Sequence, residues 1–194
     1  MKINLNVVIF SLFIMSTSCS SESKLVKNLR AYTQAHNAHD VNKAMSFYSD
    51  DIRFEMVGSR IKKGKDEIRK LEEWDASVNS HLEFTDIEVK GDTIKCKAIE
   101  KNDLFTASGI QKLEYESVIF VFQDGLIKEV KAKQTKESLK NMESVFKKFI
   151  EWASTEKTKE LEELKKKGEF IFTPENAEKW LSLVREWRKK ENAN

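Results

Sequence analysis

Apolar residues in the first third of the chain recur every three or four positions, which is the period of a helix. Leu25, Leu29 and Tyr32, followed by His36, share such a face. The segments predicted to be helical on this basis are 25–36, 41–48 and 66–78. Between the second and third of these helices, residues 52–56 alternate between apolar and polar and predict a short strand.

The period changes to two after the third predicted helix. The segments that alternate, and that we predict to be strands, are 81–90, 93–105, 111–123 and 126–134. Gly91-Asp92 and Asp124-Gly125 separate neighbouring strands by two residues of the type that closes tight hairpins. The middle of the chain therefore predicts an antiparallel meander that follows three helices.

The pattern is helical again beyond the last predicted strand. Residues 139–150 carry an apolar stripe, and 156–167 are almost entirely Glu and Lys. Thr173 followed by Pro174 is typical of a helix start, and the helix that follows carries apolar residues such as Trp180. These tail helices must bury their aromatic residues, either against the protein's own sheet or against a partner.

The amino terminus has the pattern of a secretion signal. Lys2 precedes a mostly apolar run at 3–15, and the small residues 16–18 stand immediately before Cys19. The apolar run is shorter than the roughly 20 residues that span a bilayer. This arrangement resembles a bacterial lipoprotein signal, which implies that Cys19 is lipidated and anchors the chain to a membrane of the cell envelope. The alternative is an ordinary signal peptide with a cysteine near its end.

Charge and cysteine content narrow the classes of partner. The chain has 34 Lys and Arg against 32 Asp and Glu, and they are interspersed, which argues against a nucleic-acid partner. If Cys19 carries lipid, Cys96 is the remaining thiol, and its place between apolar Ile94 and Ala98 predicts a buried, inert group. No residues have metal-ligand spacing, so we expect no metal.

Four short segments resemble the NTF2-like superfamily, which includes the SnoaL-like polyketide cyclases and ketosteroid isomerase. They are residues 32–40 (YTQAHNAHD), 47–52 (FYSDDI), 64–69 (GKDEIR) and 120–127 (FVFQDGLI). The resemblance implies an α+β fold, a cone in which a curved antiparallel sheet packs on three N-terminal helices. The resulting division of the chain is a signal peptide at 1–18, a tether at 19–24, the NTF2-like domain at 25–135 and a helical extension at 136–194.

Ketosteroid isomerase needs a tyrosine, a protonated acid beside it and an aspartate base. The resemblance places the family's tyrosine at Tyr32, the base at Met56 and the acid at Val118. Methionine cannot abstract a proton and valine cannot donate a hydrogen bond. We therefore expect no steroid isomerase chemistry, and the resemblance implies no cofactor.

Alternation along the strands indicates which polar residues face the inside of the cone. It places Glu100 and Asn102 on one strand, Glu116 on the next, and Gln134 on the last. Two carboxylates close together raise the pKa of one of them and so create an acid and a base. Glu100 and Glu116, assisted by Tyr32, are therefore candidate catalytic residues. The alternative is that both glutamates are hydrated at a wide mouth.

The candidate ligand-binding set adds the apolar walls of the cone to these polar residues. Its members are Tyr32, His36, Phe54, Met56, Trp74, Asn102, Val118 and Gln134. Three functions remain open. The first is binding of a small, mainly apolar molecule, and the second is a cofactor-independent SnoaL-like enzyme that transfers a proton or activates water.

The third function is that of a protein-interaction module. By the same alternation, the outer face of the third meander strand would carry Leu113, Tyr115, Ser117, Ile119 and Val121. A face this apolar needs a cover. The tail helices or a second subunit, in a homodimer, would have to supply it.

Overall fold

The structure is a computed structural model that describes residues 23–166, 168–171 and 173–193. The predicted signal peptide and Cys19 lie outside the described residues, so lipidation stays a prediction.

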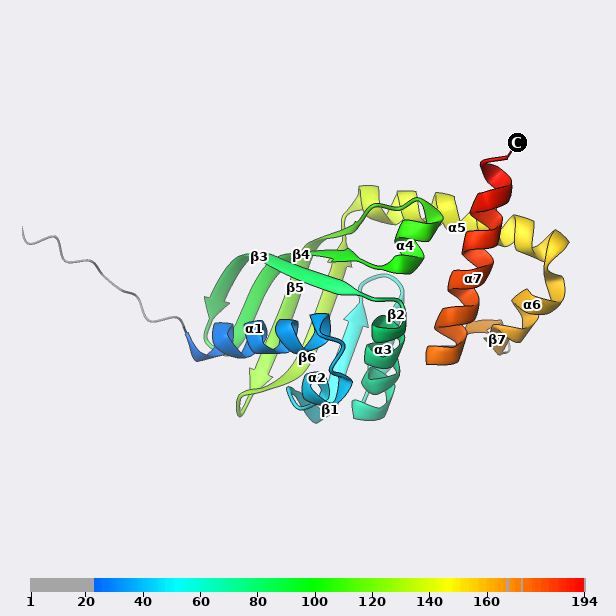
Figure 1. Cartoon of the computed structure of the whole chain (residues 1–194). Coiled ribbons are helices and arrows are strands. Elements are labelled where there is room, and N and C mark those ends of the chain that lie inside the picture. Colours follow the sequence, from blue (N-terminus) through cyan, green and yellow to red (C-terminus); the bar gives the residue numbers. More distant parts are fainter. Residues whose placement is uncertain (1–22, 167, 172, 194) are drawn as a thin grey trace, which may run out of the picture.

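Six strands form one curved sheet in the order β2-β1-β6-β5-β4-β3 (Figure 1). They are β1 (Tyr48–Met56), β2 (Arg60–Lys63), β3 (His81–Lys90), β4 (Thr93–Lys101), β5 (Leu113–Gln123) and β6 (Leu126–Gln134). β1 runs parallel to β6, whereas every other neighbouring pair is antiparallel. The predicted α+β cone is confirmed.

Helices cover the concave face of the sheet and one end of it. They are α1 (Lys24–Asn37), α2 (Val41–Met45), α3 (Lys65–Ser77), α4 (Asp103–Ser108), α5 (Lys136–Glu156), α6 (Thr158–Glu163) and α7 (Pro174–Glu191). A two-stranded hairpin of β7 (Lys165–Lys166) and β8 (Glu169–Phe170) separates α6 from α7. In Figure 1, α1 to α3 lie in front of the sheet, and α5 to α7 stand beside it at one end.

Side-chain caps fix where most of these helices begin. A cap accepts a hydrogen bond from a free backbone N–H of the first turn and stabilises a helix by about 1 kcal/mol. The capping residues are Ser23, Asp40, Asn102, Thr135 and Thr173. The cap at Thr173, with Pro174 in the first turn, confirms the helix start predicted from the sequence.

The sequence prediction that a strand continues to residue 105 is wrong. Asn102 accepts a hydrogen bond from the backbone N–H of Phe105 at 2.8 Å, so its side chain starts α4 instead of extending β4. Gly109 closes this short helix with φ 90°, a conformation that favours glycine. The segment between β1 and α3, where the sequence pattern predicts no strand, contains β2, which pairs antiparallel with β1.

A β-bulge reverses the predicted facing of the first residues of β5. The register of β5 shifts between Tyr115 and Ser117, so Tyr115 and Val118 both face the interior although they are three residues apart. Alternation counted back from Val118 therefore fails at the bulge. Leu113 and Tyr115 are buried inside the cone, whereas Glu116 is exposed.

Two hydrophobic cores form. The first lies between the sheet and α1 to α3. The second joins α5, α6 and α7 to α3 and α4, and its aromatic members are Trp74, Phe149, Trp180 and Trp187. Val145 and Phe146 on α5 pack against both cores. The tail helices thus cover α3 and α4 of their own chain, which answers the question of where their aromatic residues go.

The outer face of the sheet carries ion pairs. Arg53 lies 2.7 Å from Glu55 and 2.6 Å from Glu129, and Lys131 lies 3.4 Å from Glu129. The bulge turns Leu113 and Tyr115 of the predicted apolar outer face inward, while Ser117, Ile119 and Val121 alternate with buried residues and are half-buried. A homodimer through this face stays a prediction.

Candidate functional site

A small apolar cavity of about 70 Å³ lies inside the cone. Its lining residues are Tyr32, Tyr48, Met56, Leu82, Phe84, Ala98, Tyr115, Val118, Phe120, Val130 and Ala132. Among the residues predicted to bind a ligand, Tyr32, Met56 and Val118 lie on this wall. Phe54 packs against the surrounding core, whereas Trp74 faces the second core and not the cone. The prediction that Trp74 forms a wall of the cone is wrong.

A buried carboxylate, Glu72 of α3, joins two walls of this cavity. The Tyr32 hydroxyl donates to Glu72 Oε1 at 3.0 Å, and the Tyr48 hydroxyl lies 2.8 Å from that of Tyr32 and 3.0 Å from Oε1. Burial and the charge of Glu72 raise the pKa of both tyrosines, so both stay protonated and can donate. The network fixes α1 and β1 against α3 through hydrogen bonds to a charged group.

His36 supplies the positive charge that pairs with the negative charge of Glu72. Its Nδ1 lies 2.9 Å from Glu72 Oε2, and the residue is 4% exposed. Burial lowers the pKa of His36, but the hydrogen bond and charge of Glu72 outweigh it, with help from Asp75 and Glu100, and raise the pKa to about 9. His36 is therefore an imidazolium at neutral pH.

Glu100 lies next to the cavity wall, with the polar groups of Tyr115, Asn102 and Ser80 around it. We call this region the polar end of the cone. It accepts hydrogen bonds from the Tyr115 hydroxyl at 2.6 Å and from the Asn102 amide at 3.1 Å, and the Ser80 hydroxyl lies 3.4 Å away. Asn102 thus caps α4 and holds Glu100 with the same side chain. The predicted inward facing of Glu100 agrees with this geometry.

Asp75 of α3 is the second carboxyl group at this end. Burial and the charge of Glu100 raise the pKa of Asp75 to about 8, although His36 and Arg60 act in the opposite sense. Burial lowers the pKa of Arg60, which interacts electrostatically with Asp75, Tyr115 and Glu100. Two carboxyl groups, those of Asp75 and Glu100, therefore interact electrostatically with the guanidinium of Arg60.

The predicted pairing of Glu100 with Glu116 is wrong. Glu116 lies on the outer face of β5, where Lys133 lies 2.5 Å away and lowers the pKa of its carboxyl group. The bulge beside Tyr115 is the physical reason. Glu100 is instead hydrogen-bonded to Tyr115 and Asn102, and its charge raises the pKa of Asp75 on α3.

Several site residues were missed by the sequence analysis, and some of them left a signal. Glu72 and Asp75 stand four residues after Ile68 and Leu71, on the apolar face of the predicted third helix. Charged residues on such a face are almost never buried unless they are paired. The sequence pattern places Tyr48 in a helix and Tyr115 on the outer face, and it predicts no helix or strand at Arg60, so these three residues give no usable signal.

Gln134, predicted to face the cone, points to the same side as Tyr115. The two residues are paired between β5 and β6, and the Gln134 amide nitrogen lies 4.0 Å from the sulfur of Met142 on α5. Helix α5 therefore packs over the end of the sheet beside the polar groups.

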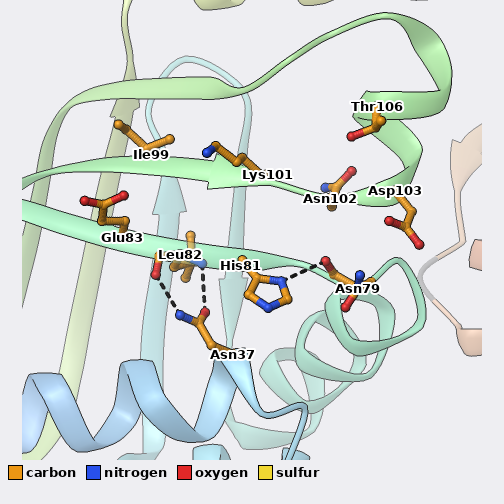
Figure 2. Close-up of a pocket in the computed structure, with 10 residues that line it drawn as sticks. All are labelled: Asn37, Asn79, His81, Leu82, Glu83, Ile99, Lys101, Asn102, Asp103 and Thr106. Carbon is orange, nitrogen blue, oxygen red and sulfur yellow. Dashed lines mark hydrogen bonds between the residues drawn. The ribbon is translucent and has the colours of Figure 1, made fainter.

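A second hollow, an open groove of about 520 Å³, lies between α4 and the ends of β3 and β4 (Figure 2). Its lining residues are Asn37, Asn79, His81, Leu82, Glu83, Ile99, Lys101, Asn102, Asp103 and Thr106. The Asn37 amide pairs with the Leu82 backbone, donating to its carbonyl at 2.9 Å and accepting from its N–H at 2.8 Å. Leu82 lines both hollows.

In the part of the chain that the structure describes, no group of His, Cys, Asp and Glu residues could hold a metal ion. Cys96 is buried, and burial raises the pKa of its thiol to about 12, in agreement with an inert group. No helix among the described residues is both long and apolar enough to cross a membrane.

Comparison with known proteins identifies the family. A family model described as a SnoaL-like domain matches residues 29–130, which is more than half of the chain. The chain belongs to the SnoaL-like domain family. This membership agrees with the NTF2-like cone and with the boundaries of the first core. No curated protein matches the chain.

Solved structures similar to this SnoaL-like domain confirm the fold. The epoxide hydrolase/cyclase-like enzyme SalBIII of salinomycin biosynthesis is 12% identical, with a TM-score of 0.53 over 59% of this chain and 93% of its own. An M. tuberculosis LEH-like epoxide hydrolase is 14% identical, with a TM-score of 0.52 over 61% and 87%. An NTF2-like protein of unknown function from Cytophaga hutchinsonii is 8% identical, with a TM-score of 0.50 over 62% and 97%.

The titration of His36 and Asp75 predicts that the folded protein loses stability as pH rises. Both groups have a higher pKa folded than unfolded, so the folded state binds more protons. The contribution of His36 is complete below pH 6.5 and is lost through pH 9. At 1.36 kcal/mol per pKa unit, this amounts to about 3 kcal/mol. Urea unfolding at pH 6.5 and 9.5 measures the difference.

Variants of these two groups provide the controls. His36→Gln should destabilise the protein at pH 6.5 and flatten the pH dependence, whereas His81→Gln, at an exposed site, should leave the dependence unchanged. Asp75→Asn should stabilise the protein above pH 8, because the charged carboxylate is then absent. Stability that rises between pH 6.5 and 9.5 would contradict the assigned titrations.

Proposed function

We propose that this SnoaL-like chain binds a small molecule inside its cone, with the apolar part of the ligand among the tyrosine rings. The cavity of about 70 Å³ carries this proposal. Protein interiors contain few voids larger than a water molecule. An engineered apolar cavity of about 150 Å³ holds benzene, so a space half that size suits a group smaller than benzene, such as a short branched chain or the end of a longer one.

The polar end of the cone supports a ligand that is not purely apolar. Tyr115 lines the cavity with its ring and bonds Glu100 with its hydroxyl, so the apolar and polar regions are contiguous. Pockets for small molecules combine apolar walls with a few convergent polar groups. A molecule with an apolar body and one polar group fits this arrangement better than a hydrocarbon does.

Filling the cavity should abolish binding. Ala98 lines the cavity and Ile99, the next residue, lines the outer groove, so Ala98→Leu fills the cone while Ile99→Leu is its matched control. In thermal unfolding, saturating 2-methyl-1-butene, which is smaller than benzene, should raise the midpoint of the wild type and of Ile99→Leu but not that of Ala98→Leu, because a ligand stabilises the state that binds it.

Native mass spectrometry of the protein purified from its own host provides an independent measurement. We expect a retained small molecule in the wild type and its absence in Ala98→Leu. Equal thermal shifts for both variants, or no retained molecule and no shift for the wild type, would rule out binding in the cone.

We further propose that this binding takes place at the cell envelope, with the chain anchored through lipid on Cys19. The support is the sequence pattern of residues 1–19. Cys19→Ser should move the protein from the membrane fraction to the soluble fraction. In the wild type, the mass of the mature N-terminal peptide should include acyl chains, and an unmodified cysteine would contradict the anchor.

The carboxyl groups at the polar end of the cone favour a second candidate function, that of an enzyme that adds water to an epoxide or a similar electrophile. Asp75 has a pKa of about 8 and is protonated at neutral pH, beside a carboxylate that can accept a proton. Glu100 would take a proton from water as the water oxygen attacks carbon. Asp75 would donate its proton to the ring oxygen as the carbon–oxygen bond breaks.

Conversion of cyclohexene oxide to its diol, followed by NMR, tests the enzyme. Asp75→Asn and Glu100→Gln should each lower the rate by about 10²-fold or more, and the wild-type rate should fall above pH 8 as Asp75 loses its proton. Glu116→Gln, on the outer face, should leave the rate unchanged. If both site variants keep the wild-type rate, this mechanism is excluded.

A further inference from the structure

The open groove between α4 and the ends of β3 and β4 is larger than the cavity in the cone, and no step of the proposed cone binding uses it. Its volume of about 520 Å³ lies within the range of about 300–1,000 Å³ that is typical of small-molecule pockets. Cross-strand pairing of His81 with Lys101 and of Glu83 with Ile99 places these four side chains on one face of the two strands. Ala98 points to the opposite face and lines the cone. The groove is therefore built mainly on the outer side of the sheet.

Three charged side chains of the groove make no ion pair with any residue that the structure describes. They are Lys101 of β4, Glu83 of β3 and Asp103 of α4, and none has an opposite charge within 4.0 Å in the described part of the chain. Elsewhere on β4, by contrast, Lys97 lies 2.8 Å from Asp86. The groove thus offers one ammonium group and two carboxylates whose hydrogen-bonding capacity is open to a ligand.

Hydrogen bonds hold the end of the groove at Asn79 in a defined geometry. The Asn79 carbonyl accepts from His81 Nδ1 at 3.1 Å (Figure 2), and the Asn79 side-chain oxygen accepts from His39 Nε2 at 2.8 Å. His39 and Asn79 have φ of 58° and 53°, a conformation that persists in such residues only where the surrounding structure fixes it and that is frequent at ligand sites. Because a carbonyl oxygen can only accept, His81 carries a proton on Nδ1, and Nε2 of the neutral ring is an acceptor.

The mixed charges of the groove restrict the chemistry of its ligand. An anion would be repelled by Glu83 and Asp103, and a cation by Lys101. A zwitterion meets both signs, but ion pairs in an open groove are weakened by water and salt and contribute little. A hydroxyl group both donates and accepts, so a molecule with several hydroxyls can bond groups of either charge. Leu82 and Ile99, which are half-buried, offer an apolar surface to the C–H groups of such a molecule.

We propose that this groove is a second binding site, for a neutral carbohydrate. Lys101 donates hydrogen bonds to sugar oxygens, while Glu83 and Asp103 accept them from sugar hydroxyls, with His81 Nε2 as a further acceptor. The C–H face of a sugar ring packs on Ile99. The site does not depend on the proposed binding in the cone, because the two use opposite faces of β4.

Four disaccharides test the site on the full chain, namely maltose, cellobiose, lactose and N,N′-diacetylchitobiose. In calorimetric titration at least one of them should bind, and its affinity should change by less than about 2-fold between about 0.15 M and about 1 M NaCl, since the ligand carries no charge to be screened. In a sample labelled with ¹⁵N-histidine, the same sugar should shift the ring resonances of His81 and leave those of His36 in place. Glycylglycine is the zwitterionic comparison, and we expect no binding of it.

Variants locate the sugar. Lys101→Met keeps the aliphatic stem and removes the ammonium group, so sugar affinity should fall by about 10-fold, which corresponds to about 1.4 kcal/mol. Its matched control is Lys97→Met, exposed on the same strand but outside the groove, which should bind as the wild type does. Glu83→Gln should likewise weaken binding, whereas Glu88→Gln, exposed on β3 outside the groove, should not. Ala98→Leu, which fills the cone, should retain sugar binding in full.

Absence of binding by all four disaccharides overturns the proposal, as does binding of glycylglycine alone. Sugar binding that leaves the His81 resonances unmoved, or that Lys101→Met retains in full, places the sugar elsewhere and also overturns it. Loss of sugar binding in Ala98→Leu would assign the sugar to the cone and not to the groove.

Discussion

The buried carboxylate of Glu72 is the group on which the inside of the cone depends. It faces two tyrosine hydroxyls with one oxygen and an imidazole with the other, so three side chains from α1 and β1 are held by one residue of α3. Removing one partner of a buried ion pair is strongly destabilising, by about 3–5 kcal/mol, since it leaves the other charge uncompensated. The tyrosine walls of the cavity therefore stand where Glu72 places them.

The ion pair of Glu72 and His36 also sets the electrostatics of the polar end of the cone. Glu72 keeps His36 charged, and that positive charge opposes the rise in the pKa of Asp75 that burial and Glu100 cause. Asp75 consequently titrates near neutral pH instead of remaining protonated throughout. The same series of charges connects the packing of α1 on α3 with the raised pKa of Asp75, so a core interaction influences the polar end of the cone.

The sequence predicted the fold well because its signals are local. Helical spacing at Leu25, Leu29 and Tyr32 and the glycine turns at Gly91 and Gly125 each depend on neighbouring residues, and the family segments confirmed their order. The site was predicted less well because it depends on non-local geometry. The bulge after Tyr115 arises from pairing with β4 and β6, and no feature of the alternation itself marked it.

Helix α3 connects the tail helices with the groups inside the cone. One side of α3 presents Glu72 to the cone, while Trp74 packs into the core formed with α5 and α7. Asp75 lies between these two sides, and loss of water is the largest cause of its raised pKa. Because α7 packs along α3, the tail helps to exclude water from the helix that carries both acids. A SnoaL-like domain without this extension would expose α3, and its Asp75 would titrate closer to an ordinary carboxyl group.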